Sequence, residues 1–263
     1  MQRLQHDLLR NIQWADLLEL RKRDVVHELL ISLPWLAASL LAAAGHHYVT
    51  ALACSFMFFL AGLRQVHNAF HYALGLSRSA CDYVMLLLSV LMLGSMHAVQ
   101  INHLRHHNHC MADDDIEAMG ARLSAIGAIM LGPWYPWCLH RKALEVATLR
   151  QRKWIHVELT ANCVWIGLVF LLLEFPALRY HVLAMAVGQC LTAFFAVWTT
   201  HHGCVREGPI ARTIRNRFKA VITYNMFYHF EHHIFPSVPT CKLPILASRI
   251  DESAPQHQLK QVY

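Results

Sequence analysis

Histidine is the residue type with the clearest chemical potential in this sequence, because it occurs 20 times among 263 residues. Packing alone does not account for so high a frequency. Eight of these histidines fall into three short clusters, two with the pattern H-x-x-H-H and one with H-x-x-x-H. In chain order the clusters contain His67 and His71, then His103, His106 and His107, and then His229, His232 and His233. Neutral imidazole suits iron, copper, nickel and zinc, so the clusters predict a metal site.

The spacing within each cluster supports this interpretation. Residues three or four apart share one face of a helix, so each cluster would project its imidazoles in one direction. A lone histidine is usually an ordinary polar residue, whereas eight converging imidazoles would repel one another if protonated. A bound cation explains such a convergence simply. Because a zinc ion takes about four ligands, eight nitrogens predict two metal ions, and iron is the metal expected at a histidine-rich oxygen-activating site.

The elements that must position these clusters are strongly apolar. Hydrophobic residues make up 56% of the chain and charged residues 15%, against about 25% charged residues in soluble domains. This composition excludes a disordered chain and most soluble enzymes, and it predicts an integral membrane protein. The net charge of +6 is expected to reflect basic residues on one membrane face, and no nucleic-acid partner is expected.

Two apolar hairpins can be recognised in the sequence. Residues 29–63 contain no Asp, Glu, Lys or Arg, and a later apolar pair is interrupted by Phe175 and Pro176. Helices of about 20 residues cross a bilayer core. The sequence therefore predicts an all-α integral membrane fold with two transmembrane helical hairpins in a single domain, 1–263. The expected spans are 25–44, 48–66, 155–174 and 178–200.

The segments 83–104 and 123–140 are also uncharged apart from histidine. Periodicity alone does not separate a span from a re-entrant or interfacial helix, and we expect the latter for both; a third hairpin formed by the two segments stays open. With two hairpins, Arg179 is the one basic residue in the outer turns. The other Lys and Arg residues fall on the side of both termini, which predicts that this side and the histidine-rich cap are cytoplasmic.

Cysteine contributes no second metal motif. The eight cysteines are scattered singly without a C-x-x-C pair, which argues against a thiolate zinc site or a disulfide framework. We expect them to be reduced, mostly apolar fillers. The N-terminal segment is polar and mixed in charge, and it lacks the pattern of a cleaved signal peptide.

The order of the three histidine clusters, with an apolar hairpin between the second and third, resembles the membrane fatty acid desaturase superfamily. The segment 229–239, H-F-E-H-H-I-F-P-S-V-P, closely resembles the third histidine box of acyl-lipid desaturases, and the resemblance extends over about 29–250. It implies a di-iron centre with two iron ions, O₂ as co-substrate and a separate electron donor. The ligands it implies are His67, His71, His103, His106, His107, His229, His232 and His233.

Members of this superfamily often have one more histidine ligand just after the last span. Here T-T-H-H-G at 199–203 occupies that position and resembles the E-H-x-G stretch of related alkane hydroxylases. The resemblance favours His201 over His202 as the ninth ligand. Threonine stands where those proteins have glutamate, which departs from the pattern.

Several polar groups near the clusters have two interpretations. The acidic run 113–117 is either a solvated loop or the source of a carboxylate that accepts a hydrogen bond from a ligand imidazole, and Glu231 and Asn225 are further candidates for such contacts. His97 either packs in the core or faces the site, and His109 is either near the ligands or solvated. A basic strip either contacts anionic headgroups or docks an acidic electron donor; it consists of Arg206, Arg212, Arg215, Arg217 and Lys219.

Eight further histidines lie outside the clusters, and we expect ordinary packing or solvent roles for them. They are His6, His27, His46, His47, His140, His156, His181 and His257.

The sequence thus predicts an O₂-dependent di-iron membrane oxidoreductase, first of all a fatty acid or acyl-lipid desaturase. Carotenoid ketolation or hydroxylation and alkyl hydroxylation are alternatives with the same boxes, because the outcome depends on how the substrate carbon is positioned. The chain has no H-P-G-G haem motif or cysteine cluster, so the donor is expected to be a separate ferredoxin, rubredoxin or cytochrome b5 type protein. The expected membrane is a bacterial inner membrane, or the endoplasmic reticulum in a eukaryote. A non-enzymatic metal-handling protein is a distant alternative, disfavoured because the clusters lie at span ends rather than at the bilayer midplane.

Overall fold

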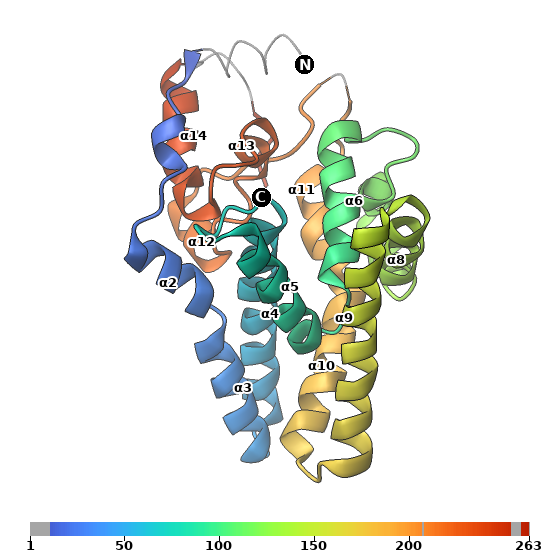
Figure 1. The fold of residues 1–263 in the computed structure, drawn as a ribbon. Helices are drawn as coiled ribbons and strands as arrows, with labels where there is room; N and C mark the ends of the chain where they lie inside the picture. Colours follow the sequence, from blue (N-terminus) through green and yellow to red (C-terminus); the bar gives the residue numbers. More distant parts are fainter. Residues whose placement is uncertain (1–10, 207, 254–258, 263) are drawn as a thin grey trace.

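A computed structural model of the chain describes residues 11–206, 208–253 and 259–262. Over these residues the secondary structure is helical, with one isolated bridge between Thr213 and Gln261. Figure 1 shows two long hairpins whose turns lie at the same end, and a cap of short helices at the opposite end. The all-α membrane fold predicted from the sequence is therefore confirmed.

The first hairpin pairs a broken helix with a continuous one. Helices α2 (Lys22–Leu30) and α3 (Leu33–Ala44) follow each other closely, and α4 (Tyr48–Phe70) returns beside α3. Lys22–Ala44 and Tyr48–Phe70 are both long and apolar enough to cross a membrane. Each helix exceeds the limits expected from apolar composition alone, and the second one thereby carries His67 within its last turn.

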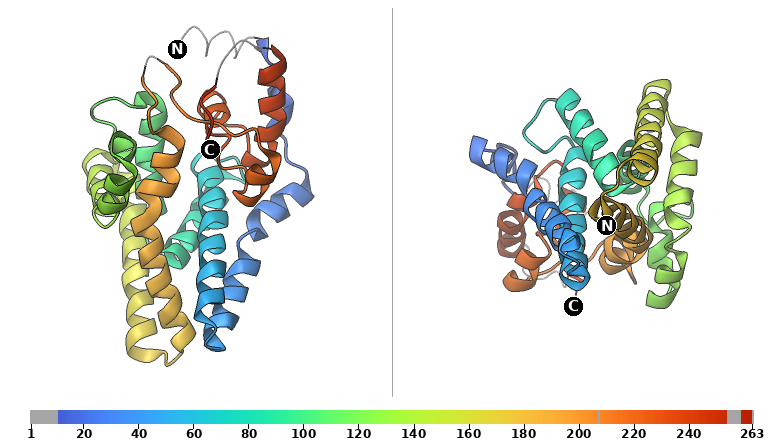
Figure 2. Two further views of the ribbon diagram at one scale, coloured as in Figure 1. Left: turned by 180° about the vertical axis from the view of Figure 1, so that it is seen from behind. Right: turned by 90° about the horizontal axis from the view of Figure 1, so that it is seen from below.

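The first arm of the second hairpin is α9 (Leu149–Gly167), which ends in the π-helical turn η3 (Leu168–Leu172). The second arm is α10 (Pro176–Thr192), which continues into the π-helical η4 (Ala193–Trp198) and then α11 (Thr199–His201). Leu149–Leu172 and Pro176–His201 complete the four candidate spans of the described chain. Helix α10 packs against both α3 and α4, so the two hairpins form one bundle (Figure 2).

Local capping explains why the third span begins before its apolar stretch. Thr148 and Gln151 form a capping box in which each residue satisfies the other's backbone N–H. The helix consequently begins at Leu149, six residues before the predicted limit, and includes charged residues in its first turns. The helix therefore extends beyond the apolar stretch, because the cap rather than hydrophobicity determines where it begins.

The segment predicted at 83–104 is two helices rather than one. Helices α5 (Arg78–Met92) and α6 (Met96–His109) meet at an angle of 112°, and Leu93 at the break has a left-handed φ of 56°. If this bent pair counted as one broken span, the described chain would have five candidate spans. The sharp bend is compatible with a broken span or with a re-entrant segment, and it directs α6 toward the cap.

The segment predicted at 123–140 also divides into short helices, α7 (Ala125–Leu131) and α8 (Tyr135–Val146). Between them Gly132 lies against α10, where an added Cβ would be 1.7 Å from the carbonyl oxygen of Cys190. No other residue type fits there without moving the backbone. This close approach allows the two short helices to pack against the second hairpin.

The cap is built from η2 (Glu117–Arg122) and from the C-terminal elements α12 (Arg217–Ile222), α13 (His229–Ile234), η5 (Thr240–Lys242) and α14 (Leu243–Ser253). Its apolar core joins Phe230 and Phe235 to Leu243 and Leu246, together with Leu17 of η1 (Ala15–Leu17). Arg249 also binds Asp16 with both terminal nitrogens at 2.7 Å. In the cap, the N-terminal and C-terminal parts of the described chain therefore pack against each other, at the open end of the hairpins.

Candidate metal centre

Nine histidines from four parts of the chain meet where the cap closes over the hairpins. Seven of the nine histidines are buried, and His71 and His107 are half-buried. They come from the end of α4 (His67 and His71), from α6 (His103, His106 and His107), from α11 (His201) and from α13 (His229, His232 and His233). The structure therefore brings together every histidine that the sequence singled out as a ligand.

Five of the rings form a first group around α4 and α6. The Nε2 atoms of His71 and His103 are 3.0 Å apart, those of His103 and His107 are 3.2 Å apart, and those of His107 and His232 are 2.8 Å apart. The His67 ring lies beside them, with its centroid 4.1 Å from that of His232. We call His67, His71, His103, His107 and His232 the first histidine group.

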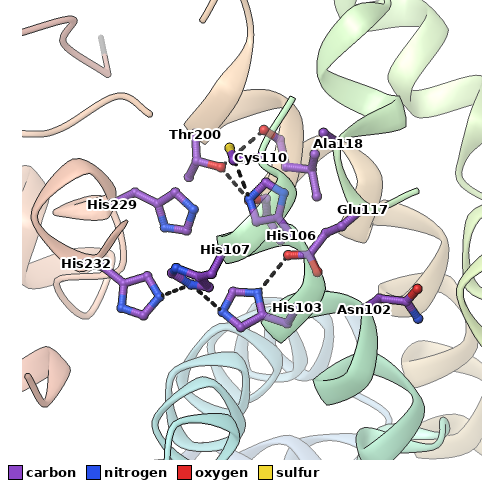
Figure 3. Close-up of polar contacts among 12 residues, drawn as sticks. Asn102, His103, His106, His107, Cys110, Glu117, Ala118, Thr200, His229 and His232 are labelled. Carbon is purple, nitrogen blue, oxygen red and sulfur yellow. Dashed lines mark hydrogen bonds and ion pairs between the residues drawn. The ribbon is translucent and has the colours of Figure 1, made fainter. Parts of the chain in front are cut away.

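Four rings form a second group, nearer to α11. The Nε2 atom of His201 lies 3.1 Å from that of His106 and 2.9 Å from that of His229, and the Nε2 atoms of His229 and His233 are 3.2 Å apart. We call His106, His201, His229 and His233 the second histidine group. Figure 3 shows how rings from α6 and α13 face one another across the site.

Hydrogen bonds behind the rings fix which nitrogen carries a lone pair. His106 donates from Nδ1 to Asp115 at 2.7 Å, and His201 donates from Nδ1 to the carbonyl oxygen of Ile210 at 2.7 Å. A metal ligand is a neutral imidazole with one N–H, so as ligands both rings would present Nε2 lone pairs to an ion. Two nitrogens bound to one ion at about 2.1 Å are about 3 Å apart when they subtend a right angle, and the two Nε2 atoms are 3.1 Å apart.

Burial of the rings favours their neutral form, in which a nitrogen lone pair is available to a metal ion. Burial lowers the pKa values of His229, His232 and His233 well below the ordinary histidine value, with neighbouring histidines lowering them further. These rings are therefore neutral at physiological pH, as metal ligands must be. Within the described chain, neither ring nitrogen of His67 has a hydrogen-bond partner. A buried, unpaired imidazole is costly, and the cluster as a whole fits a pair of cations.

The structure separates His201 from its neighbour His202. His201 is 2% exposed and belongs to the second histidine group. His202 turns away, donates from Nδ1 to the carbonyl oxygen of Ala121, and stacks on Trp198. The structure thus places His201, and not His202, among the clustered rings. Thr200, the threonine that stands in place of glutamate, donates from its hydroxyl to the carbonyl oxygen of Ala196 within its own helix.

The acidic run combines both of the interpretations left open by the sequence. Asp113 and Asp114 are exposed, whereas Asp115 and Glu117 accept hydrogen bonds from imidazoles. Glu117 accepts from Nδ1 of His103 at 2.8 Å, in the same way that Asp115 accepts from His106. Such carboxylates orient a ligand ring and raise its basicity, so one carboxylate supports each histidine group.

Glu231, although it lies between ligands in sequence, supports α13 rather than an imidazole. Its buried carboxylate accepts from Thr213 at 2.6 Å and pairs with Arg215 at 2.8 Å. Asn225 lies in a left-handed turn with φ 59°, where the chain reverses before α13. Both residues therefore help to orient α13 and the histidines that it carries.

The other residues for which the sequence allowed two interpretations lie outside the histidine cluster. His97 donates to Glu158 at 2.7 Å and stacks on Trp154, and His109 is exposed. His6 and His257 lie outside the described residues. The basic strip is not one exposed surface, because Arg212 is buried and Arg215 is engaged by Glu231 and Asp251.

A buried polar network holds α4 in place beneath the first histidine group. Glu28 of α2 accepts from Arg64 at 3.0 Å and from Asn68 at 3.0 Å. Asn68 in turn accepts from the backbone N–H of Thr240 in the cap. This network was not predicted from the sequence, although three polar residues at 64, 65 and 68 at the end of an apolar span are a signal for it.

Cys110 was not predicted to lie at the site, because the cysteines were expected to be mostly apolar fillers. Its thiol lies beside the second histidine group, with Sγ 3.8 Å from Nε2 of His106. The i, i+4 spacing from His106 to Cys110 was a usable signal. All eight cysteines of the chain are free.

A long apolar cavity of about 460 Å³ leads away from the histidines. His67, His103 and His229 line its inner end, and Phe56, Leu60 and Phe195 line it between α4 and η4. Glu117 also lines the cavity, so one polar group faces an otherwise largely apolar space. The dimensions and lining suit a flexible hydrocarbon chain with a carbon placed beside the imidazoles.

The helical hairpins and the histidine-rich cap define a class of integral membrane protein with a clustered-histidine site. Comparison with known families places the chain within that class: the fatty acid desaturase family matches residues 43–263, and the chain belongs to that family. A stretch of 39 residues is also 49% identical to the sphingolipid delta(4)-desaturase/C4-monooxygenase of Bos taurus. That stretch covers 14% of this chain and 12% of the bovine protein.

Proposed function

We propose that this protein is an O₂-dependent di-iron oxidoreductase that desaturates the acyl chain of a lipid. Family membership supports a desaturase-type oxidoreductase that acts on a lipid. The observation that supports the finer proposal is the pair of histidine groups, in which neighbouring Nε2 atoms lie 2.8–3.2 Å apart.

The two histidine groups would hold one iron ion each. The first group offers five imidazoles and the second offers four, and these ligands suit iron. When bound, such an iron pair supplies the chemistry that activates O₂ and removes hydrogen from an unactivated carbon. The protein contributes the neutral rings, and Asp115 and Glu117 hold two of them in orientation from behind.

The cavity would position the substrate. Its apolar walls bury the methylene groups of an acyl chain and exclude water from the reacting carbon. The walls also restrict which carbon lies beside His67 and His103, and this positioning selects the product. Loss of two hydrogens gives an alkene, whereas transfer of a hydroxyl group to the same carbon gives an alcohol.

Hydroxylation is the second candidate, because the name of the bovine relative includes both desaturase and C4-monooxygenase. Ketolation or hydroxylation of a carotenoid ring and alkyl hydroxylation require the same metal chemistry. A non-enzymatic metal-handling role is disfavoured by the substrate-sized cavity that opens onto the histidines.

The electron donor would be a separate protein of ferredoxin, rubredoxin or cytochrome b5 type, and the cap would face the cytoplasm. The concentration of Lys and Arg on the side of the cap supports this orientation. Labelling of single cysteines in a Cys-free background tests it, since a probe beside the cap should react only from the cytoplasmic side. Reaction only from outside would contradict the proposed orientation.

The proposed reaction is tested by expressing the wild-type protein and His107→Ala in a host that lacks this activity. New unsaturated acyl chains in lipid profiles should appear with the wild-type protein alone. Hydroxylated acyl chains would instead identify the reaction as hydroxylation, and oxidised pigments would identify it as oxidation of a carotenoid. Purified iron-loaded protein that consumes no O₂ with any reductant and lipid would contradict the enzymatic proposal.

A further inference from the structure

The two histidine groups are unequal in the number of imidazoles they offer. The first contains five histidines, and the second contains four, namely His106, His201, His229 and His233. A side chain with a fifth potential donor atom lies beside the second group. It is Cys110, which is 7% exposed and free of any disulfide.

The fold places this thiol at the site through helix geometry and a sharp turn. Cys110 follows His106 by four residues, which puts both on one face at the end of α6. The chain then turns at Met111, whose φ is 61°, and the Met111 N–H donates to the same Asp115 carboxylate that accepts from His106. The turn that orients His106 therefore also fixes Cys110.

The distances around the thiol match those between ligands of one ion. Cys110 Sγ lies 3.8 Å from Nε2 of His106, the nitrogen that faces the site. It also lies 4.0 Å from Nδ1 of His201, which donates to Ile210 and is not a ligand atom. A sulfur at about 2.3 Å and a nitrogen at about 2.1 Å from the same metal are about 3.8 Å apart when they subtend about 120°. Figure 3 shows the thiol directed toward the His106 ring. Potential ligand atoms of Cys110, His106, His201 and His233 all lie within 4.8 Å of one another.

An independent observation indicates that a cation belongs beside this thiol. His106 and His201 each use Nδ1 as a hydrogen-bond donor, so as neutral ligands both rings would present a buried Nε2 lone pair to one ion, with the two nitrogens 3.1 Å apart. Nδ1 of His233, in the same group, is buried and has no hydrogen-bond partner among the described residues. Cys110 is therefore not an isolated thiol, because it lies beside two histidines whose geometry suits a metal ion.

We propose that Cys110 is a fifth ligand of the metal bound by the second histidine group. The proposal rests on the metal centre of the proposed function, and it makes that centre asymmetric, with five imidazoles at one ion and four imidazoles plus a thiolate at the other. On binding, the Cys110 S–H bond breaks, the sulfur–metal bond forms, and the proton passes to solvent. The thiolate adds negative charge at one metal only, which stabilises the more oxidised state of that ion.

Cobalt(II) is the probe for this proposal, because a cobalt–thiolate bond produces a charge-transfer absorption that cobalt–imidazole bonds lack. The full-length protein is purified, stripped of metal and titrated with Co²⁺. The wild-type protein should bind two ions per chain and show the thiolate band. Cys110→Ser should lose the band, keep one high-affinity ion, and bind the other ion at least about ten-fold more weakly.

Cys204→Ser is the matched control, because Cys204 is also buried and also lies in the loop region at the end of a span. It should keep the band and both affinities. An unchanged band in Cys110→Ser would overturn the proposal, and so would loss of the band in Cys204→Ser alone.

A measurement on the wild-type protein removes any dependence on the folding of a variant. X-ray absorption of the cobalt-loaded protein should require one sulfur at about 2.3 Å. Two bound cobalt ions with nitrogen and oxygen scatterers only would overturn the role of Cys110 and leave the proposed function standing. Failure to bind any cobalt would overturn both.

Discussion

Asp115 accepts a 2.7 Å hydrogen bond from Nδ1 of His106, nine residues earlier in the chain. The carboxylate is buried, and it also accepts from the backbone N–H groups of Met111 and Ala118. One side chain therefore holds a ring of the second histidine group and closes the turn that follows α6. This relationship connects the acidic run after the second histidine cluster to the metal centre.

Asp115→Ala should weaken metal binding without abolishing the fold. Loss of the hydrogen bond frees the His106 ring to rotate and lowers its basicity, so affinity for one iron and turnover should each fall about 10- to 100-fold. Iron titration of the purified variant measures the first effect. Asp114→Ala is the control, since Asp114 is exposed and forms only a surface pair with Arg105 at 3.3 Å, which contributes little stability. Equal losses in the two variants would contradict the role of Asp115.

His201→Ala and His202→Ala should behave differently although the residues are neighbours. His201 faces the second histidine group, so its removal should reduce the iron content by about one ion per chain and abolish turnover. His202 stacks on Trp198 outside the cluster, so its removal should leave the iron content unchanged and lower thermal stability slightly. Metal analysis of the two purified variants tests this. A reversed pattern would exchange their roles.

Leu60→Trp should shorten the longest acyl chain that the enzyme accepts. Leu60 lies along the apolar cavity between α4 and α10, and the larger indole fills the space that terminal methylene groups would occupy. Activity should fall for long chains and persist for chains shorter by a few carbons. Leu183→Trp is the control, because Leu183 is exposed on the outer side of α10. A uniform loss at all chain lengths in Leu60→Trp would argue against this path for the substrate.

Glu158→Ala should destabilise the bent pair α5 and α6. Glu158 is fully buried in α9 and accepts from the Ser95 hydroxyl at 2.6 Å and from the N–H of His97 at 3.0 Å. Its loss leaves these donors unsatisfied at the start of the helix that carries three of the clustered histidines, at a cost of about 1–3 kcal/mol each. Thermal unfolding in detergent should shift to lower temperature, whereas Glu174→Ala, in the exposed turn between α9 and α10, should leave it unchanged. Equal midpoints would contradict the assigned role.

The sequence was sufficient to predict the helices and the ligand candidates, because both depend on local patterns. Apolar length revealed the two hairpins, and the i, i+3 and i+4 spacing revealed the histidine faces. The start of α9 lies outside the apolar stretch because it is set by the cap at Thr148 and Gln151, which composition does not show. The 112° bend between α5 and α6 depends on one left-handed residue, Leu93, a conformation that leucine does not signal.

The division of the histidines into two groups could not be predicted from spacing. His103 and His107 belong to one group and His106 to the other, although all three lie within one helical turn and a half. Which group each ring joins depends on how α13 packs against α6, and this is decided by distant contacts such as Thr213 and Arg215 with Glu231. The role of Asp115 likewise requires a turn whose geometry only the structure shows.

The iron content of the purified protein tests the central claim most directly. The account predicts two iron ions per chain in the wild-type protein. It also predicts that iron content and turnover fall together in His107→Ala, because His107 joins His103 and His232 in the first histidine group. One zinc ion and no iron, or full activity in His107→Ala, would contradict the di-iron centre.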